Sequence, residues 1–79
     1  LKLFPAELID PKQVASFRQV LPKHTHLIPV GGINVSNMGG YLNNGASGLG
    51  FGSSLFTPQL SLDAIQSNAE TIIKAWKTL

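Results

Sequence analysis

Two short glycine-rich segments decide how this chain is interpreted: Val30–Asn34, with the sequence VGGIN, and Gly48–Ser53, with the sequence GLGFGS. All eight glycines lie between Gly31 and Gly52, and residues 27–62 contain no charged side chain and no histidine. Each segment follows a short apolar run and precedes a helical pattern. Backbone N–H groups at such turns form seats for phosphate, so the two segments predict a phosphate site. The alternative is that the glycines only serve tight turns.

The patterns around these segments predict three successive strand–helix units. Strands are expected over residues 1–6, 27–30 and 46–51, and helices over residues 11–21, 35–42 and from Ser61 or Asp63 onward. Asp10 before Pro11 is typical of a helix start, Asn34 is the expected cap of the second helix, and Gly45 is expected to end it. An alternating order of this kind indicates an α/β fold with parallel strands.

Apolar residues at helical spacing predict the faces that pack in the core. The expected core positions are Val14, Phe17 and Leu21 in the first helix, Met38, Tyr41 and Leu42 in the second, and Ile65, Ala69, Ile72 and Trp76 in the third. Gly39 and Gly40 inside the second helix indicate close packing there. In the third strand, glycines occupy one whole face, which leaves space for a ligand or for another backbone.

Composition excludes several classes of function. The 79 residues allow one small domain, and the net charge of +2 comes from scattered basic residues, so no nucleic-acid partner is expected. No apolar run approaches the ~20 residues of a membrane span. Cysteine is absent, which makes a reducing, cytoplasmic compartment the expectation.

Sequence motifs also argue against a metal and a nucleotide cofactor. His24 and His26 have no carboxylates beside them, so no metal site is expected. The pattern that begins at Gly48 has Ser53 where a dinucleotide fingerprint requires its third glycine. No Gly-Lys-Ser/Thr sequence is present, which excludes a P-loop.

Lys2 is the candidate nucleophile. Alternation in the first strand places Lys2 and Phe4 on one face and Leu1 and Leu3 on the other. On an enclosed face, desolvation disfavours the charged amine, and a neutral amine attacks carbonyl groups. The alternative is an edge strand whose lysine faces water.

Three motifs together resemble the C-terminal half of the 2-keto-3-deoxy-6-phosphogluconate/phosphogalactonate aldolase family: LKLFPAE at residues 1–7, PVGGI at 29–33 and GFGSSL at 50–55. The resemblance implies a class I aldolase, a lyase, on a (β/α)8 TIM barrel. Residues 1–79 would form the C-terminal portion of that single domain, about strands 6–8 with their helices. The N-terminal portion, with the general acid/base Glu and a carboxylate-binding Arg, would not be in this chain.

The resemblance also implies roles for individual residues. Lys2 would form a Schiff base with the keto acid, and cleavage would give pyruvate and glyceraldehyde 3-phosphate without a cofactor. The residues that would contact the substrate are Phe4, Pro5, Val30, Gly31, Gly32, Gly52 and Ser53, of which the glycines and Ser53 would hold the phosphate. Val30 favours the phosphogalactonate substrate, and the family is typically trimeric.

Two alternatives remain open. One is another phosphate-binding TIM-barrel enzyme, such as an isomerase or a synthase, in which Lys2 acts electrostatically. The other is a non-catalytic βα fragment. Both are compatible with the glycine turns.

Overall fold

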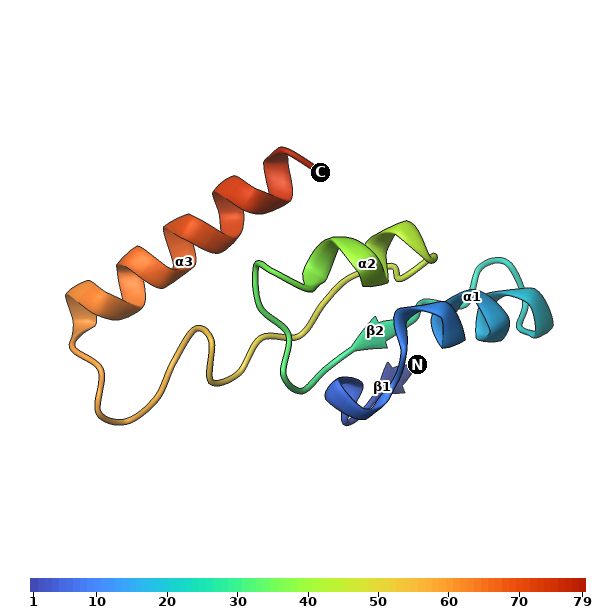
Figure 1. Cartoon of the computed structure of the whole chain (residues 1–79), viewed down its shortest axis with the longest axis horizontal. Coiled ribbons are helices and arrows are strands. Elements are labelled where there is room, and N and C mark those ends of the chain that lie inside the picture. Colours follow the sequence, from blue (N-terminus) through green and yellow to red (C-terminus); the bar gives the residue numbers. More distant parts are fainter.

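The structure, a computed structural model, describes every residue from Leu1 to Leu79. In chain order (Figure 1), it contains strand β1 (Lys2–Leu3), the short 3-10 helix η1 (Ala6–Leu8), helix α1 (Pro11–Val20), strand β2 (Ile28–Pro29), helix α2 (Met38–Asn43) and helix α3 (Leu62–Lys77). No helix has the length and apolar character that crossing a membrane requires.

β1 and β2 pair in parallel, with Lys2 opposite Ile28 and Leu3 opposite Pro29, so the predicted parallel α/β arrangement is confirmed. The third strand, expected over residues 46–51, is reduced to one parallel bridge between Val30 and Gly50. This segment runs beside β2, but it has a neighbour on one side only, and glycine is a weak strand former.

α1 begins where the sequence predicts. The Asp10 side chain accepts a hydrogen bond from the Lys12 N–H, and the Gln13 side chain accepts one from the Asp10 N–H, which completes a capping box. The helix ends at Val20, one residue before the predicted end.

α2 begins three residues later than predicted, at Met38 instead of residue 35. Asn34 does not cap this helix. Its side-chain oxygen accepts from the N–H groups of Ser36 and Asn37 and so stabilises a separate turn. The predicted end is correct: Gly45 has φ of 104°, and its N–H donates to the Leu42 carbonyl.

The core lies between the two strands and the helices α1 and α2. Its buried residues are Leu3, Ala6, Val14, Leu27, Ile33, Met38 and Tyr41. The predicted core is therefore correct at Val14, Met38 and Tyr41, whereas Phe17 is exposed. The close packing predicted at Gly39 and Gly40 is present at Gly39, where a Cβ would lie 3.3 Å from Cδ2 of Leu79, whereas a Cβ on Gly40 would make an ordinary contact of 3.4 Å with Cγ of Pro11.

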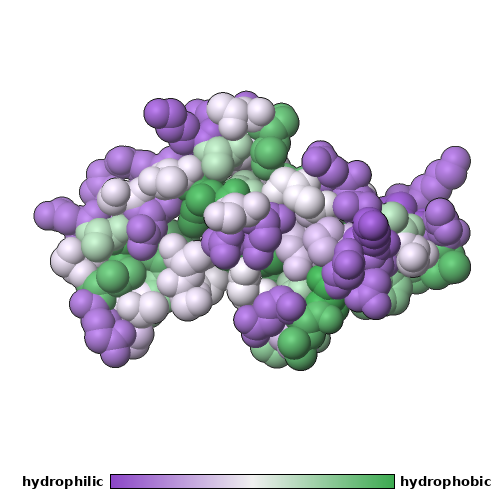
Figure 2. All heavy atoms as spheres, viewed as in Figure 1, coloured by the Kyte–Doolittle hydropathy of each residue, from purple (hydrophilic) through white to green (hydrophobic).

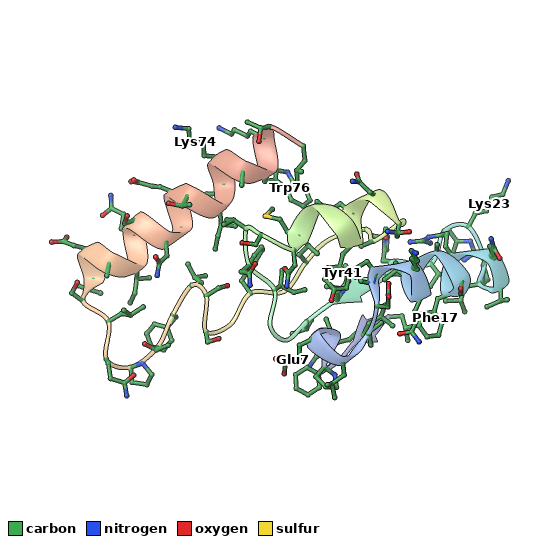
Figure 3. All side chains as sticks on the ribbon, viewed as in Figure 1. Glu7, Phe17, Lys23, Tyr41, Lys74 and Trp76 are labelled. Atoms are coloured by element: carbon green, nitrogen blue, oxygen red, sulfur yellow. The ribbon has the colours of Figure 1, made fainter.

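α3 departs from the prediction. Ser61 caps it, accepting from the Ala64 N–H, but none of its residues is buried and Trp76 is 47% exposed. The stripe expected to be core is only half-buried at Ile65, Ala69 and Ile72 and is exposed at Trp76, because few elements of the chain pack against it. Figure 1 shows α3 set apart from the strands at the end of a long connection, and Figure 3 shows Lys74 on its outer side.

Candidate active site

The first glycine turn follows directly from β2 and requires glycine at two positions. Gly31 and Gly32 have φ of 104° and 72°, a region that other residues rarely adopt. A Cβ on Gly32 would lie 2.8 Å from Cβ of Glu7, and one on Gly31 would lie 3.2 Å from the Phe4 ring. The segment after β1 therefore packs directly on this turn.

Two carbonyl groups of the turn are bound by that same segment. The Ala6 N–H donates to the Val30 carbonyl over 2.8 Å, and the Glu7 N–H donates to the Gly31 carbonyl over 3.1 Å. In a trans peptide unit, the N–H of the next residue points away from the carbonyl. The N–H groups of Gly31 and Gly32 accordingly point away from this segment.

A side chain holds the third carbonyl of the turn. Nδ2 of Asn37 donates to the Gly32 carbonyl over 2.8 Å, which turns the Ile33 N–H to the opposite side. The N–H groups of Gly31, Gly32 and Ile33 donate to no group of the chain. Three successive free N–H groups next to bound carbonyls are the donor pattern of an anion seat.

The second glycine turn is tied to the first by one hydrogen bond. Oγ of Ser54 donates to the Ile33 carbonyl over 2.6 Å. In this turn the N–H groups of Gly52 and Ser53 also have no acceptor in the chain, and both residues are exposed. No heavy atom lies within 4 Å of a Cβ built on Gly52. Two sets of free donors thus lie on neighbouring turns.

The expected open face of the third strand is partly filled. A Cβ on Gly50 would lie 2.7 Å from Cγ2 of Val30, and one on Gly48 would lie 3.2 Å from Cδ1 of Ile28. These two glycines therefore make room for side chains of the β2 segment. The open space that the sequence predicts is present at Gly52 only.

Lys2 and the first turn are connected through one aromatic ring. Nζ of Lys2 lies 5.1 Å from the centroid of the Phe4 ring, a cation–π distance, and the same ring packs against Gly31. Cα of Pro5 lies 3.3 Å from a Cβ built on Gly31. Lys2 is exposed, and Phe4 is 64% exposed, so within this chain the lysine is not desolvated as an enclosed face would require.

Tyr41 anchors the segment that carries these contacts. Its hydroxyl donates to the Ala6 carbonyl over 2.7 Å and lies 3.1 Å from the Ile9 carbonyl oxygen. Burial raises the pKa of Tyr41 above its usual value of 10.0, and the carboxylates of Asp10 and Glu7 add to the effect. Figure 3 shows Tyr41 on α2 and Glu7 on the segment after β1.

Sequence reasoning missed three side chains that shape this site: Asn37, Tyr41 in its hydrogen-bonding role, and Ser54. Tyr41 was expected only as a core residue. The side chains of Asn37 and Ser54 donate hydrogen bonds to carbonyls of the first turn. These partners depend on how the turns fold, and no sequence motif indicates them. Ser54 stands next to the predicted Ser53, so the motif pointed to the right segment.

The site is an open surface and not a cavity. No group of three or more His, Cys, Asp or Glu residues is arranged to hold a metal, and His24 and His26 are exposed. What the arrangement offers is a primary amine, an aromatic ring and a row of neutral N–H donors. It can bind an anion and present a carbonyl group to an amine.

No protein-family model matches the chain. It is 29% identical over 77 residues to 2-dehydro-3-deoxy-6-phosphogalactonate aldolase of Escherichia coli (strain K12), a match that covers 98% of this chain and 38% of the relative. It is 33% identical over 76 residues to a probable 2-dehydro-3-deoxy-6-phosphogalactonate aldolase of Rhizobium meliloti (strain 1021), covering 96% of this chain and 36% of the relative. The chain thus spans a little over a third of these proteins.

Solved structures agree with these relatives. A structure described as "Native KDPGal structure" superposes with a TM-score of 0.95 at 28% identity, over 99% of this chain and 38% of that one. A cube-shaped, highly porous protein cage, designed by fusing symmetric oligomeric domains, matches with the same score and identity over 29% of its chain. The resemblance to the 2-keto-3-deoxy-6-phospho sugar acid aldolases is confirmed, in sequence and in backbone.

Proposed function

We propose that the protein carrying this chain, which resembles the 2-keto-3-deoxy-6-phospho sugar acid aldolases, is itself a class I aldolase of that kind. It would cleave its substrate to pyruvate and glyceraldehyde 3-phosphate. The observation that carries the proposal is the Phe4 ring, which lies within cation–π distance of the Lys2 amine and packs against the glycine turn with its free N–H donors. One ring therefore links a candidate nucleophile to a candidate phosphate seat.

In the proposed reaction, the Lys2 amine attacks C2 of the keto acid and water leaves, which forms an iminium. The proton of the C4 hydroxyl is removed and the C3–C4 bond breaks. Its electron pair forms the C2=C3 double bond while the π pair of the C=N bond moves to the nitrogen, which gives an enamine. Glyceraldehyde 3-phosphate leaves. Protonation of the enamine at C3 and hydrolysis of the resulting iminium then release pyruvate and restore the amine.

The phosphate of the substrate would bind at the two glycine turns. The donors are the N–H groups of Gly31, Gly32, Gly52 and Ser53, together with the Ser53 hydroxyl. Hydrogen bonds to a charged acceptor are roughly twice as strong as neutral ones, so neutral N–H groups suffice where no cation is near. Phe4 and Pro5 would pack beside the imine and keep its orientation.

The finer parts of the proposal concern substrate, domain and assembly. Val30 would lie near the sugar hydroxyls and favour phosphogalactonate over phosphogluconate. Residues 1–79 would be the C-terminal portion of one TIM-barrel domain, and the general acid/base Glu and the carboxylate-binding Arg would come from its other strands. We expect a homo-oligomer, a trimer by resemblance to the family.

Trapping of the imine tests the proposed chemistry. Borohydride added to the full-length protein with pyruvate should reduce the imine and add a fixed mass to Lys2, located by peptide mass spectrometry. Lys2→Arg should abolish both the adduct and cleavage, whereas Lys77→Arg, a change at another exposed lysine, should abolish neither. Normal cleavage by the Lys2→Arg variant would refute the proposal.

A second function rests on a specific observation, the exposure of Lys2. A barrel enzyme of another class, such as an isomerase, could use the same glycine turns for phosphate and the Lys2 charge for electrostatic stabilisation. In that case the protein would bind inorganic phosphate at the turns, and pyruvate with borohydride would leave Lys2 unmodified.

A further inference from the structure

The amide side chain of Asn37 is the only donor to the Gly32 carbonyl in the first glycine turn. We propose that Asn37 is a positioning residue for phosphate: it holds the Gly32–Ile33 peptide unit so that the Ile33 N–H faces the seat. This inference rests on the proposed function, because it assigns a further donor, Ile33, to the same phosphate site.

Both ends of the Asn37 amide are engaged within the turn. Its Nδ2 donates to the Gly32 carbonyl over 2.8 Å, and its Oδ1 accepts from the Asn34 N–H over 2.9 Å. The Asn34 side chain in turn accepts from the Asn37 N–H over 3.1 Å. The amide thus closes the turn from Gly32 to Asn34 and fixes the direction of the Gly32–Ile33 peptide unit.

Asn37 does not perform the task that its position in the chain favours. It is the N-cap residue of α2, where asparagine ordinarily accepts a hydrogen bond from an N–H of the first helical turn. No such bond is present here. Its side chain is committed instead to residues upstream, which indicates that the turn, and not the helix, requires an amide at this position.

The peptide unit that Asn37 holds is the least constrained unit of the turn. Backbone N–H groups of Ala6 and Glu7 bind the two preceding carbonyls, so among substitutions only proline would remove those donors. The Gly32 carbonyl has only the Asn37 side chain as donor. Glycine permits rotation of the adjacent peptide unit, so without this donor the carbonyl could turn toward the seat and repel phosphate.

The expected loss of phosphate affinity has two parts, because the Gly32–Ile33 peptide unit has an N–H donor at one end and a carbonyl oxygen at the other. Loss of Asn37 removes one N–H donor from a charged ligand and admits a carbonyl oxygen in its place. A hydrogen bond to a charged group corresponds to roughly tenfold or more in affinity. An Asn37→Asp change keeps the acceptor for the Asn34 N–H but places a carboxylate oxygen against the Gly32 carbonyl, so its effect should be larger.

The experiment measures aldol addition of pyruvate by the full-length protein to two acceptors, glyceraldehyde 3-phosphate and glyceraldehyde. For Asn37→Ala, we expect KM for glyceraldehyde 3-phosphate to rise about tenfold with kcat little changed. The kinetics with glyceraldehyde should change less than about twofold. Asn37→Asp should raise the first KM further. Inhibition by inorganic phosphate should weaken in parallel.

Asn44→Ala is the matched control. Asn44 lies at the other end of α2, where its Nδ2 donates to the Gly40 carbonyl over 2.7 Å, so its loss removes a comparable bond from the same helix. In this variant, the kinetics with glyceraldehyde 3-phosphate and with glyceraldehyde should change equally or not at all. The contrast separates a general effect on α2 from an effect on the phosphate seat.

Three outcomes would overturn the inference. The first is an unchanged KM for glyceraldehyde 3-phosphate in both Asn37 variants. The second is an equal loss for both acceptors, and the third is the loss of pyruvate trapping at Lys2 in these variants, since trapping involves no phosphate. Absence of trapping in the unmodified protein refutes the proposed function instead, so the two failures are distinguishable.

Discussion

Gly32 combines a backbone conformation and a contact that both exclude a side chain. Its φ is 72°, and a Cβ would lie 2.8 Å from Cβ of Glu7, an atom close to the backbone that cannot swing away. A non-glycine residue in this conformation costs about 1–3 kcal/mol. Gly32→Ala should lower the melting temperature of the full-length protein and weaken its affinity for inorganic phosphate.

Gly52→Ala provides the control for that prediction. Its φ is not positive and the space around it is open, so the fold should tolerate the methyl group. If phosphate approaches the Gly52 backbone, this variant should lose phosphate affinity while keeping its melting temperature. Calorimetry of phosphate binding and thermal melts check both variants. A Gly32→Ala protein with unchanged stability would contradict the packing described here.

Val30 is the residue expected to influence which epimer of the substrate is preferred. Its Cγ2 fills the space above Gly50, and threonine has nearly the same shape, so Val30→Thr should fold normally. The added hydroxyl can bond to a sugar hydroxyl. We expect the ratio of kcat/KM for 2-keto-3-deoxy-6-phosphogluconate to that for 2-keto-3-deoxy-6-phosphogalactonate to rise, by about tenfold if one such bond forms. Equal ratios in both proteins would remove Val30 from the specificity determinants.

At the scale of elements, the sequence predicts helix ends that depend on neighbouring residues, but it does not predict contacts between residues far apart in the chain. The starts of α1 and α3 and the end of α2 follow from Asp10, Ser61 and Gly45, whose partners lie within four residues. The start of α2 was misplaced because Asn34 and Asn37 compete for the same turn. The link from Ser54 to the Ile33 carbonyl joins positions 21 residues apart, and no local pattern reports it.

Tyr41 couples α2 to the segment after β1. Its hydroxyl also makes the free energy of unfolding depend on pH in the alkaline range. Because its pKa is raised in the folded state, the unfolded chain loses the proton first as the pH rises. The stabilisation is complete below the unfolded pKa, near 10.0, and is lost as the pH rises through the folded pKa. Thermal melts from about pH 9 to about pH 11 should show this decline.

Tyr41→Phe should change that profile in two ways. Removing a hydroxyl that bonds to the Ala6 carbonyl should cost about 1 kcal/mol at neutral pH. The part of the alkaline decline due to Tyr41 should disappear. If the variant shows the same slope as the unmodified protein in this range, other groups cause the decline.

Arg18 fastens α1 to two later segments. Its guanidinium donates to the carbonyls of Gly45 and Thr25 and to the Ser47 hydroxyl. Arg18→Ala should destabilise the full-length protein by roughly 2–3 kcal/mol, because several partly buried acceptors lose their donor. Lys12→Ala, a change at an exposed residue of the same helix, should stay within about 0.5 kcal/mol. Denaturant unfolding measures both, and equal effects would contradict the role of Arg18.

At the scale of the whole molecule, the chain leaves much of its apolar surface exposed. Only 8 of 79 residues are buried, and Leu8, Leu62 and Phe56 are among the exposed large apolar residues. Figure 2 shows hydrophobic residues at the surface of the pictured face, in patches between hydrophilic ones. A sheet of two short strands is marginal by itself. These features support the proposal that further strands of the same domain cover this surface.

The isolated 79-residue chain and the full-length protein should differ in how they unfold and in how much apolar surface they expose. The isolated 79-residue chain should bind the dye ANS, associate in sedimentation experiments and unfold over a broad temperature range, because its apolar surface lacks a cover. The full-length protein should unfold cooperatively and bind little dye. Adding the separately produced N-terminal portion to the isolated chain should lower dye binding if the two parts complete one barrel. A monomeric isolated chain with a sharp calorimetric transition would show instead that residues 1–79 suffice as a domain.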